Sequence, residues 1–190
     1  MDHQPDENWV QDILEFWFSE LNPKQWFTKS EETDSLIGKR FKILYVMLAN
    51  TAVDQLLDDG RMALASVIVL DQFPRNMFRD TPAAFASDTQ ALELAKRAVS
   101  LGFDDGMADD QRVFLYLPFE HSENLADQDQ AVALITAIGN DDYTRYAEAH
   151  RDIIRQFGRF PHRNAILNRP LTPKEEVFLA PGSKTKWKKF

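Results

Sequence analysis

Residues 61–73 read "RMALASVIVLDQF", and every side chain from Met62 to Leu70 except Ser66 is apolar. A helix on a protein surface keeps a polar side, whereas this stretch has almost none, so we expect a central helix that is buried on every side. Its apolar part, residues 62–70, is less than half as long as the ~20 residues of a membrane span. The stretch therefore predicts the core of a globular protein and no membrane-spanning segment.

Helical periodicity continues on both sides of this central stretch. Apolar residues recur every three or four positions at 10–21, 37–48, 125–135 and 143–157. The alternating pattern of half-buried strands is absent, and no Asn-Gly or Asp-Gly turn stands between strand-like runs. We therefore predict an all-α fold of antiparallel helical hairpins joined by short loops. Such hairpins allow a solenoid-like stack, although no clear repeat of ~34 residues is visible.

Several helix boundaries are indicated by capping residues. Ser30, followed by two glutamates, predicts a helix start, and Asp88 is expected to cap another helix. Thr81 before a proline predicts a short turn of helix. Thr172 and Glu175 have the spacing of a capping box, which predicts a last short helix near the end of the chain.

Length and composition favour one domain in a reducing compartment. The chain has 190 residues, of which 44% are hydrophobic, enough for a substantial core. We predict a single all-helical domain over residues 1–180 and a basic C-terminal tail at 181–190. The absence of cysteine excludes disulfides and thiolate sites. The first ten residues, "MDHQPDENWV", lack the pattern of a signal peptide, so we expect a soluble, cytoplasmic protein.

Charge is distributed unevenly along the chain. Residues 142–190 contain 11 Lys or Arg and 5 Asp or Glu, a net charge of +6, so residues 1–141 carry −14 of the total of −8. The acidic total disfavours nucleic-acid binding. Two explanations of the asymmetry stay open: the acidic helices pair internally with the basic C-terminal quarter, or the basic region meets an external anionic partner.

Two segments far apart in the chain have nearly the same sequence: residues 72–76 read "QFPRN" and residues 157–164 read "FGRFPHRN". Proline disfavours the α conformation at the preceding residue, so Phe73 and Phe160 are predicted to be extended where their helices end. An arginine near a helix C-terminus also complements the helix dipole. The two segments would have similar sequences if each one ends a helix. They would also have similar sequences if they meet in space and form one site.

Asp71 favours the second explanation. It is predicted to lie in the last turn of the central helix, where a negative charge opposes the helix dipole. A buried carboxylate is tolerated only when it is paired and hydrogen-bonded. We therefore hypothesise that Asp71 pairs with guanidinium groups, with Arg75 from its own segment and Arg159 or Arg163 from the other as candidates.

A third polar segment, "LPFEHSENL" at residues 117–125, supplies candidates for acid–base chemistry. Glu120 and Glu123 would share a face if the segment were helical, and His121 stands between them. His150 lies inside an apolar stripe, where a histidine is more often a satisfied core residue than a ligand. Neither HExxH nor the Glu-x-x-His of di-iron bundles occurs. We therefore predict no metal site and no cofactor.

If the two Phe-Pro segments converge, their donors form a positively charged site suited to a carboxylate or phosphate. Asp71, Glu120 and Glu123 would then be its internal counter-ions, and a closed structural network would leave no charge for a ligand. The residues do not decide between these two outcomes. The predicted ligand-binding set is Asp71, Arg75, Asn76, His150, Arg159, His162, Arg163 and Asn164.

Three stretches, at residues 70–88, 114–128 and 153–179, resemble the bacterial domain-of-unknown-function family numbered 924, and the resemblance covers about residues 8–180. It implies an all-helical fold with helical hairpins in a right-handed, tetratricopeptide-like arrangement, and it implies no reaction. The chain has Asn168 where the family usually has glycine; asparagine also adopts left-handed geometry, so the turn is expected to survive. The family's motif positions here are Asp71, Gln72, Pro74, Arg75, Asn76, Phe85, Asp88, Pro118, His121, Ser122, Glu123, Gln128, His150, Gly158, Arg159, Pro161, His162, Arg163 and Asn164.

Three functions remain open from the sequence. The first is a pocket that binds a small anionic ligand or the acidic terminus of a peptide. The second is a hydrolase-type enzyme with an acid–base pair of His121 and either Glu120 or Glu123. The third is a purely structural network, with a protein partner bound elsewhere through the aromatic side chains of Trp26, Phe27 or Trp187.

Overall fold

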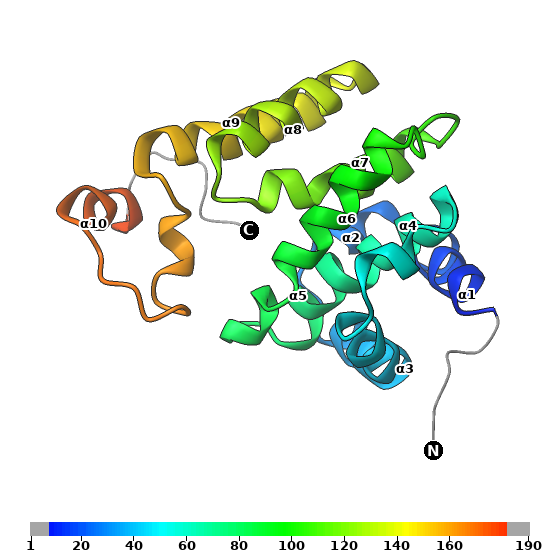
Figure 1. Cartoon of the computed structure of the whole chain (residues 1–190). Coiled ribbons are helices and arrows are strands. Elements are labelled where there is room, and N and C mark those ends of the chain that lie inside the picture. Colours follow the sequence, from blue (N-terminus) through cyan, green and yellow to red (C-terminus); the bar gives the residue numbers. More distant parts are fainter. Residues whose placement is uncertain (1–7, 182–190) are drawn as a thin grey trace.

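The computed structural model describes residues 8–181, which are helical with no strand in that range. The all-α prediction is confirmed. Figure 1 shows the long helices α6–α9 stacked beside the central stretch, with α3 on its other side and α10 apart from both. The α-helices are α1 (Trp9–Glu15), α2 (Pro23–Trp26), α3 (Glu31–Ala49), α4 (Gly60–Val67), α5 (Phe73–Met77), α6 (Asp88–Ser100), α7 (Asp109–His121), α8 (Leu125–Ile138), α9 (Asp141–Phe157) and α10 (Pro173–Leu179). Short π-helical segments are η1 (Phe16–Glu20) and η3 (Ile68–Gln72), and short 3₁₀ segments are η2 (Val53–Leu56), η4 (Pro82–Phe85) and η5 (Pro161–Arg163).

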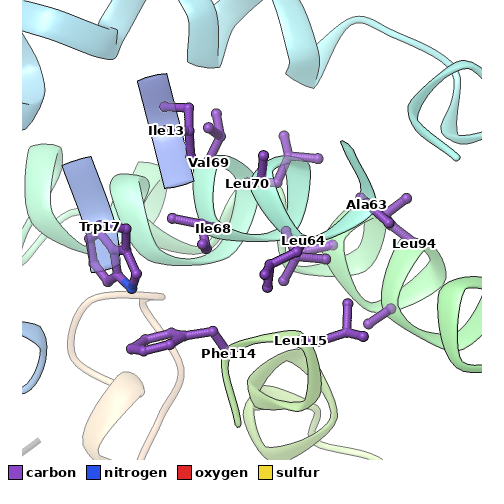
Figure 2. Close-up of a cluster of buried hydrophobic side chains, with 14 of the residues drawn as sticks. Ile13, Trp17, Ala63, Leu64, Ile68, Val69, Leu70, Leu94, Phe114 and Leu115 are labelled. Carbon is purple, nitrogen blue, oxygen red and sulfur yellow. The ribbon is translucent and has the colours of Figure 1, made fainter. Parts of the chain in front are cut away.

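The central stretch is buried as predicted. Helix α4 and the π-helical segment η3 form one continuous rod, and every residue from Ala63 to Gln72 is buried. Figure 2 shows its side chains leaving the rod in several directions, toward Trp17 on one side and toward Leu94 and Leu115 on the other. The rod therefore organises the main hydrophobic core, because helices from both halves of the chain pack on it.

The helix does not stop before Pro74, and here the sequence-based prediction was wrong. Phe73 is helical, with φ −60° and ψ −38°, and α5 continues directly from η3. Pro74 has no N–H to offer to the Leu70 carbonyl four residues back. That carbonyl instead accepts a hydrogen bond from the Ser87 hydroxyl at 2.5 Å. The π turn and this outside donor together let the chain remain helical through a proline.

The second half of the chain is a series of helical hairpins. Helix α6 packs on α7, α7 on α8 and α8 on α9. Gly139, in the left-handed conformation with φ 83°, ends α8, and the Asn140 side chain caps α9 directly afterwards, so these two helices run antiparallel. Asp88 does not cap α6 as predicted. It is the first residue of that helix, after Ser87, and its carboxylate is engaged with arginines instead.

After α9 the chain folds back in an extended loop. Phe160 is extended, with φ −86° and ψ 105°, as predicted for a residue before proline. Asn168 has φ 52°, so it adopts the left-handed geometry expected of it. A small second hydrophobic cluster of Ile153, Ile154 and Phe160 fixes this region, with Phe178 of α10 packed against it. Ser30 and Thr172 cap α3 and α10 as predicted.

No helix within residues 8–181 combines the length and the apolar character that crossing a bilayer requires. The predicted basic tail, apart from Pro181, and Trp187 lie outside the described residues. Of the other two aromatic candidates for partner binding, Trp26 is half-buried in an aromatic cluster, whereas Phe27 is 56% exposed.

Candidate functional site

Asp71 is the centre of the polar cluster. Its side chain is completely buried, and it lies in η3 at the end of the central rod. Its Oδ1 atom lies 2.8 Å from Nδ1 of His121 and 3.3 Å from Nη1 of Arg75, and its Oδ2 accepts a hydrogen bond from Gln72 at 2.6 Å. The helix continues past Asp71, so the expected conflict with a helix C-terminus does not arise.

Protonation within this group follows from the charges around it. Burial alone would raise the pKa of Asp71, but the charge of Arg75 and the hydrogen bonds from His121 and Gln72 hold that pKa well below its usual value. Burial and the nearby Arg75 lower the pKa of His121, against the opposing effect of Asp71. At pH 7 an ionised Asp71 therefore accepts the Nδ1–H of a neutral His121. The Nε2 atom of that imidazole then carries the lone pair.

Asp88 joins the two Phe-Pro segments. Its carboxylate accepts two hydrogen bonds from Arg75, at 2.8 and 3.0 Å, and lies 3.5 Å from Nη1 of Arg163. Both guanidinium groups also lie against the ring of Phe85, at 5.7 Å for Arg75 and 4.8 Å for Arg163. The segments thus meet as hypothesised, but through Asp88 rather than directly through Asp71.

Arg163 is the least satisfied cation of the cluster. It is only 7% exposed and lies between the rings of Phe85 and Phe160, with its Cζ 4.6 Å from the centre of the latter. Its Nε is buried without a hydrogen-bond partner, and within residues 8–181 its one ion-pair contact is with Asp88. Burial and the repulsion of Arg75 lower the pKa of Arg163 to about 10. The carboxylates of Asp88, Glu123 and Asp71 act against this effect but do not restore the ordinary pKa, so the fold buries a positive charge that is only partly compensated.

The two glutamates of the third segment have separate partners, and neither pairs with His121. Helix α7 ends at His121, so Glu123 lies beyond the helix; its carboxylate binds Arg169 at 2.7 and 3.0 Å and accepts the Phe160 N–H at 2.8 Å. Glu120 is buried, 3.2 Å from Nδ1 of His150. Within the described residues, His121 therefore contacts Asp71 and neither of the two glutamates predicted as its partner.

The hydrogen bonds to Glu123 also lower the pKa of its carboxyl group. Burial would raise the pKa of Glu123, but Arg169 and the Phe160 N–H together bring it below its usual value. Glu123 is thus a structural anion that holds the 158–170 loop against the end of α7. It does not have the raised pKa of a general acid.

Two predicted ligand-binding residues lie elsewhere. Arg159 donates two hydrogen bonds to Glu175, at 2.6 and 2.7 Å, and one to the Pro170 carbonyl, so its guanidinium is occupied on α10. Asn76 donates to Asp34 of α3 at 2.8 Å. In the part of the chain that the structure describes, neither residue forms a hydrogen bond or an ion pair with the side chain of Asp71 or Asp88.

The remaining predicted residues border the cluster. The ring of His150 lies 6.5 Å from that of His121 and 5.8 Å from that of Phe160, and the ring of His162 lies 5.5 Å from Phe160. The surrounding protein, together with Arg163 and His150, lowers the pKa of His162 to about 4, so it is neutral at pH 7. Asn164 is fully buried and accepts a hydrogen bond from Arg169 at 2.8 Å.

Sequence reasoning missed Asp88, which was assigned to a helix cap, and two further residues at the site as functional candidates. Arg169 is the partner of Glu123, and no spacing pattern pointed to it. Gln128 is buried and donates to the carbonyls of Phe119, Glu120 and Ser122, the last two at 2.6 and 2.7 Å. It thereby fixes the chain on both sides of His121. Gln128 belongs to the 114–128 stretch that resembles the family, and this was the signal in the sequence that could have identified it.

The cluster offers two kinds of chemistry. Arg163 can donate to an anion, and the Asp71–His121 pair can accept a proton at Nε2. Within residues 8–181, no three His, Asp or Glu side chains are arranged to hold a metal ion.

Comparison with known proteins places the chain in a family. The model of the family described as "Bacterial protein of unknown function (DUF924)" matches residues 13–183. The chain belongs to the DUF924 family. The resemblance seen in the sequence is thereby confirmed. Some of the residues in the three stretches that carry it, among them Asp71, Asp88 and His121, lie in the polar cluster.

A solved structure supports the same assignment. The DUF924 chain is 40% identical to a protein of unknown function from Agrobacterium tumefaciens, over 90% of this chain and 96% of that one, with a TM-score of 0.85. No curated protein matches the chain. These relatives establish the fold and the family, and they name no activity.

Proposed function

We propose that this DUF924 chain binds a small anionic group, a phosphate or the carboxylate of a small molecule or peptide terminus, at Arg163. The observation that carries the proposal is the state of this guanidinium: it is buried, lies between two aromatic rings, and has one ion-pair contact, at 3.5 Å, within the described residues. A planar guanidinium is the group best suited to bind carboxylate or phosphate with two hydrogen bonds.

The charges of the other arginines support the choice of Arg163. Arg75 forms ion pairs with Asp71 and Asp88. Arg159 forms one with Glu175, and Arg169 forms one with Glu123. In these ion pairs the N–O distances are 3.3 Å or less, and we assign the pairs to the structural network. The network and the anion site are thus parts of one cluster, in which Arg163 has the longest ion-pair distance, 3.5 Å to Asp88.

The arrangement of the hairpins α6–α9 supports a tetratricopeptide-like interpretation of the fold, which we also propose. Folds of stacked helical hairpins present grooves in which peptides bind, and this is an analogy from fold to function. A peptide with an acidic terminus would fit both features: the groove would bind the peptide, and Arg163 would bind its terminal carboxylate. A cysteine-free sequence fits a cytoplasmic protein that meets such ligands.

Thermal unfolding with added anions tests the proposal. Phosphate and malonate should each raise Tm of the wild-type chain; at ten times its Kd an anion stabilises by about 1.4 kcal/mol, or about 3–5 °C for a domain of this size. Phosphate also stabilises proteins non-specifically, so the comparison between variants is decisive.

Arg163→Lys removes the planar fork and should abolish the specific rise. Arg159→Lys is the matched control, because that guanidinium is already occupied by Glu175. If Arg163→Lys shows the same rise as the wild type, or if Arg159→Lys alone loses it, Arg163 is not the anion site.

A second function is favoured by one contact, the 2.8 Å approach of His121 Nδ1 to Asp71. A carboxylate that orients a neutral imidazole leaves Nε2 as a general base, which takes a proton from water as the water oxygen attacks an ester carbonyl or phosphorus atom. The bond to the leaving alcohol or phenol oxygen then breaks, and the proton on Nε2 passes to that oxygen. A panel of p-nitrophenyl esters and phosphates tests this activity. Turnover that disappears in His121→Asn and survives in His162→Asn would support it, and equal turnover in all three proteins would refute it.

A further inference from the structure

A pocket of about 420 Å³ opens between α3 and α5, and none of the residues of the Asp71–Arg163 cluster lines it. Gly38, Lys39 and Lys42 line it from one face of α3, since residues three and four apart in a helix share a side. Met77 and Phe78 line it from the end of α5. We call it the α3–α5 pocket. Its size is in the range of pockets that hold small molecules, roughly 300–1,000 Å³.

The acidic side chain at the pocket is already occupied. The carboxylate of Asp34 accepts hydrogen bonds from Asn76, at 2.8 Å, and from both Nε and Nη2 of Arg79. Its negative charge is therefore paired with Arg79 and not with either lysine. Among the residues that the structure describes, neither Lys39 nor Lys42 forms an ion pair. Two exposed ammonium groups thus lie at one pocket, and neither pairs with the carboxylate that also lines it.

Gly38 indicates that the pocket is kept open. It lies in the middle of α3 with helical backbone geometry, and a Cβ placed on it would meet Met77 Cγ at 3.9 Å, an ordinary contact. The fold therefore does not require glycine at this position, and glycine is less favourable than alanine inside a helix. What glycine provides is open space beside the Met77 side chain, on the α3 side of the pocket.

We infer that the α3–α5 pocket binds a small carboxylate with an apolar body. Lys39 and Lys42 would hold the carboxylate, and the apolar body would lie over the Gly38 backbone against Met77 and Phe78. Charge complementarity selects an anion, and the apolar side chains select against inorganic phosphate, which has no apolar body to bury. The site is independent of the one proposed at Arg163.

Titration of the full-length chain with 3-phenylpropionate, followed by calorimetry, tests the inference. We expect saturable binding that is at least roughly tenfold weaker for the neutral amide of the same compound, because the charged hydrogen bonds are lost. Inorganic phosphate should not compete. Lys39→Met and Lys42→Met should each weaken binding by roughly tenfold or more, whereas Lys24→Met, on α2 and outside the pocket, should leave it unchanged.

Gly38→Ala and Gly38→Leu separate binding from folding. Alanine should raise Tm by about 2–4 °C through helix propensity, so a loss of affinity in this variant is not a loss of fold. Leucine should fill the pocket and abolish binding. Binding that survives Gly38→Leu or both lysine variants would overturn the inference, as would no saturable binding to the wild type. Loss of binding in Arg163→Lys would place the ligand at the other site and would also overturn it.

Discussion

Nδ1 of His121 lies 2.8 Å from Oδ1 of Asp71, and this contact joins the end of the central rod to the end of α7, fifty residues away in the chain. Asp71 is fully buried, so its charge is compensated by Arg75 and by hydrogen bonds rather than by water. The same contact fixes which nitrogen of His121 carries the proton. Stability, pH dependence and the proposed chemistry of the cluster all depend on it.

We expect the protein to lose stability as the pH falls below about 6.5. The pKa of His121 is lower in the folded chain than the ~6.5 of an unfolded histidine, so the unfolded state takes up the proton first. The stabilisation is fully present above that pH and declines by up to about 1.4 kcal/mol per pH unit toward the folded pKa.

The variant His121→Asn keeps a donor for Asp71 and does not titrate. Urea unfolding at pH 7.5 and pH 5 should therefore show a smaller loss of stability for this variant than for the wild type. His162 also titrates in the folded chain with a lowered pKa, so the difference between the two proteins, and not the wild-type slope, isolates His121. Equal losses would mean that His121 does not have the protonation state assigned to it.

Removing the charge of Asp71 should be strongly destabilising. Asp71→Asn leaves Arg75 with Asp88 as its only carboxylate, and breaking a buried ion pair on one side costs about 3–5 kcal/mol. Chemical denaturation measures the change. Arg145→Gln is the control, because its ion pair with Asp142 is exposed and should contribute less than about 1 kcal/mol. An Asp71→Asn protein as stable as the wild type would refute the role of the carboxylate.

The Ser87 hydroxyl should be needed for the helix that passes through Pro74. Ser87→Ala leaves the buried Leu70 carbonyl without its donor, which costs about 1–3 kcal/mol. Pro74→Ala restores a backbone N–H nearby, so the double variant should lose less than Ser87→Ala does. Thermal unfolding of the single and double variants gives the coupling. A neutral Ser87→Ala would show that the carbonyl finds another donor.

We expect Gln128 to contribute more to the free energy of unfolding than a typical buried polar side chain. Its amide donates to three carbonyls at the end of α7, and Gln128→Met preserves the volume while removing the donors. We expect a loss of about 2–4 kcal/mol, from more than one unsatisfied carbonyl. Amide hydrogen exchange should rise at residues 119–123 in this variant, and unchanged exchange there would contradict the assignment.

Much of the fold could be predicted because its signals are local. The apolar run at 62–70 predicted the buried rod, and capping residues such as Ser30 and Thr172 predicted helix starts. The prediction that the helix ends before Pro74 was wrong because Ser87, thirteen residues further along the chain, supplies the donor that the Leu70 carbonyl needs. A donor from another element decides whether a helix continues through proline, and no local pattern reports it.

The site could be predicted only in part, because most of its contacts join residues that are far apart in the chain. Repeated letters indicated that two segments meet, yet the joining residue, Asp88, was assigned to a helix cap. Long side chains choose among several partners within reach, so Arg159 and Arg163, four residues apart, have different ones. Such pairings depend on three-dimensional placement and are not encoded in spacing.

Calorimetric titration of inorganic phosphate into the wild type, Arg163→Lys and Arg159→Lys tests the central claim, that Arg163 is a cation held for a ligand. We predict one saturable site in the wild type and in Arg159→Lys, and no detectable site in Arg163→Lys. Equal binding by all three proteins, or binding by none of them, would contradict the claim and leave the arginines with a structural role.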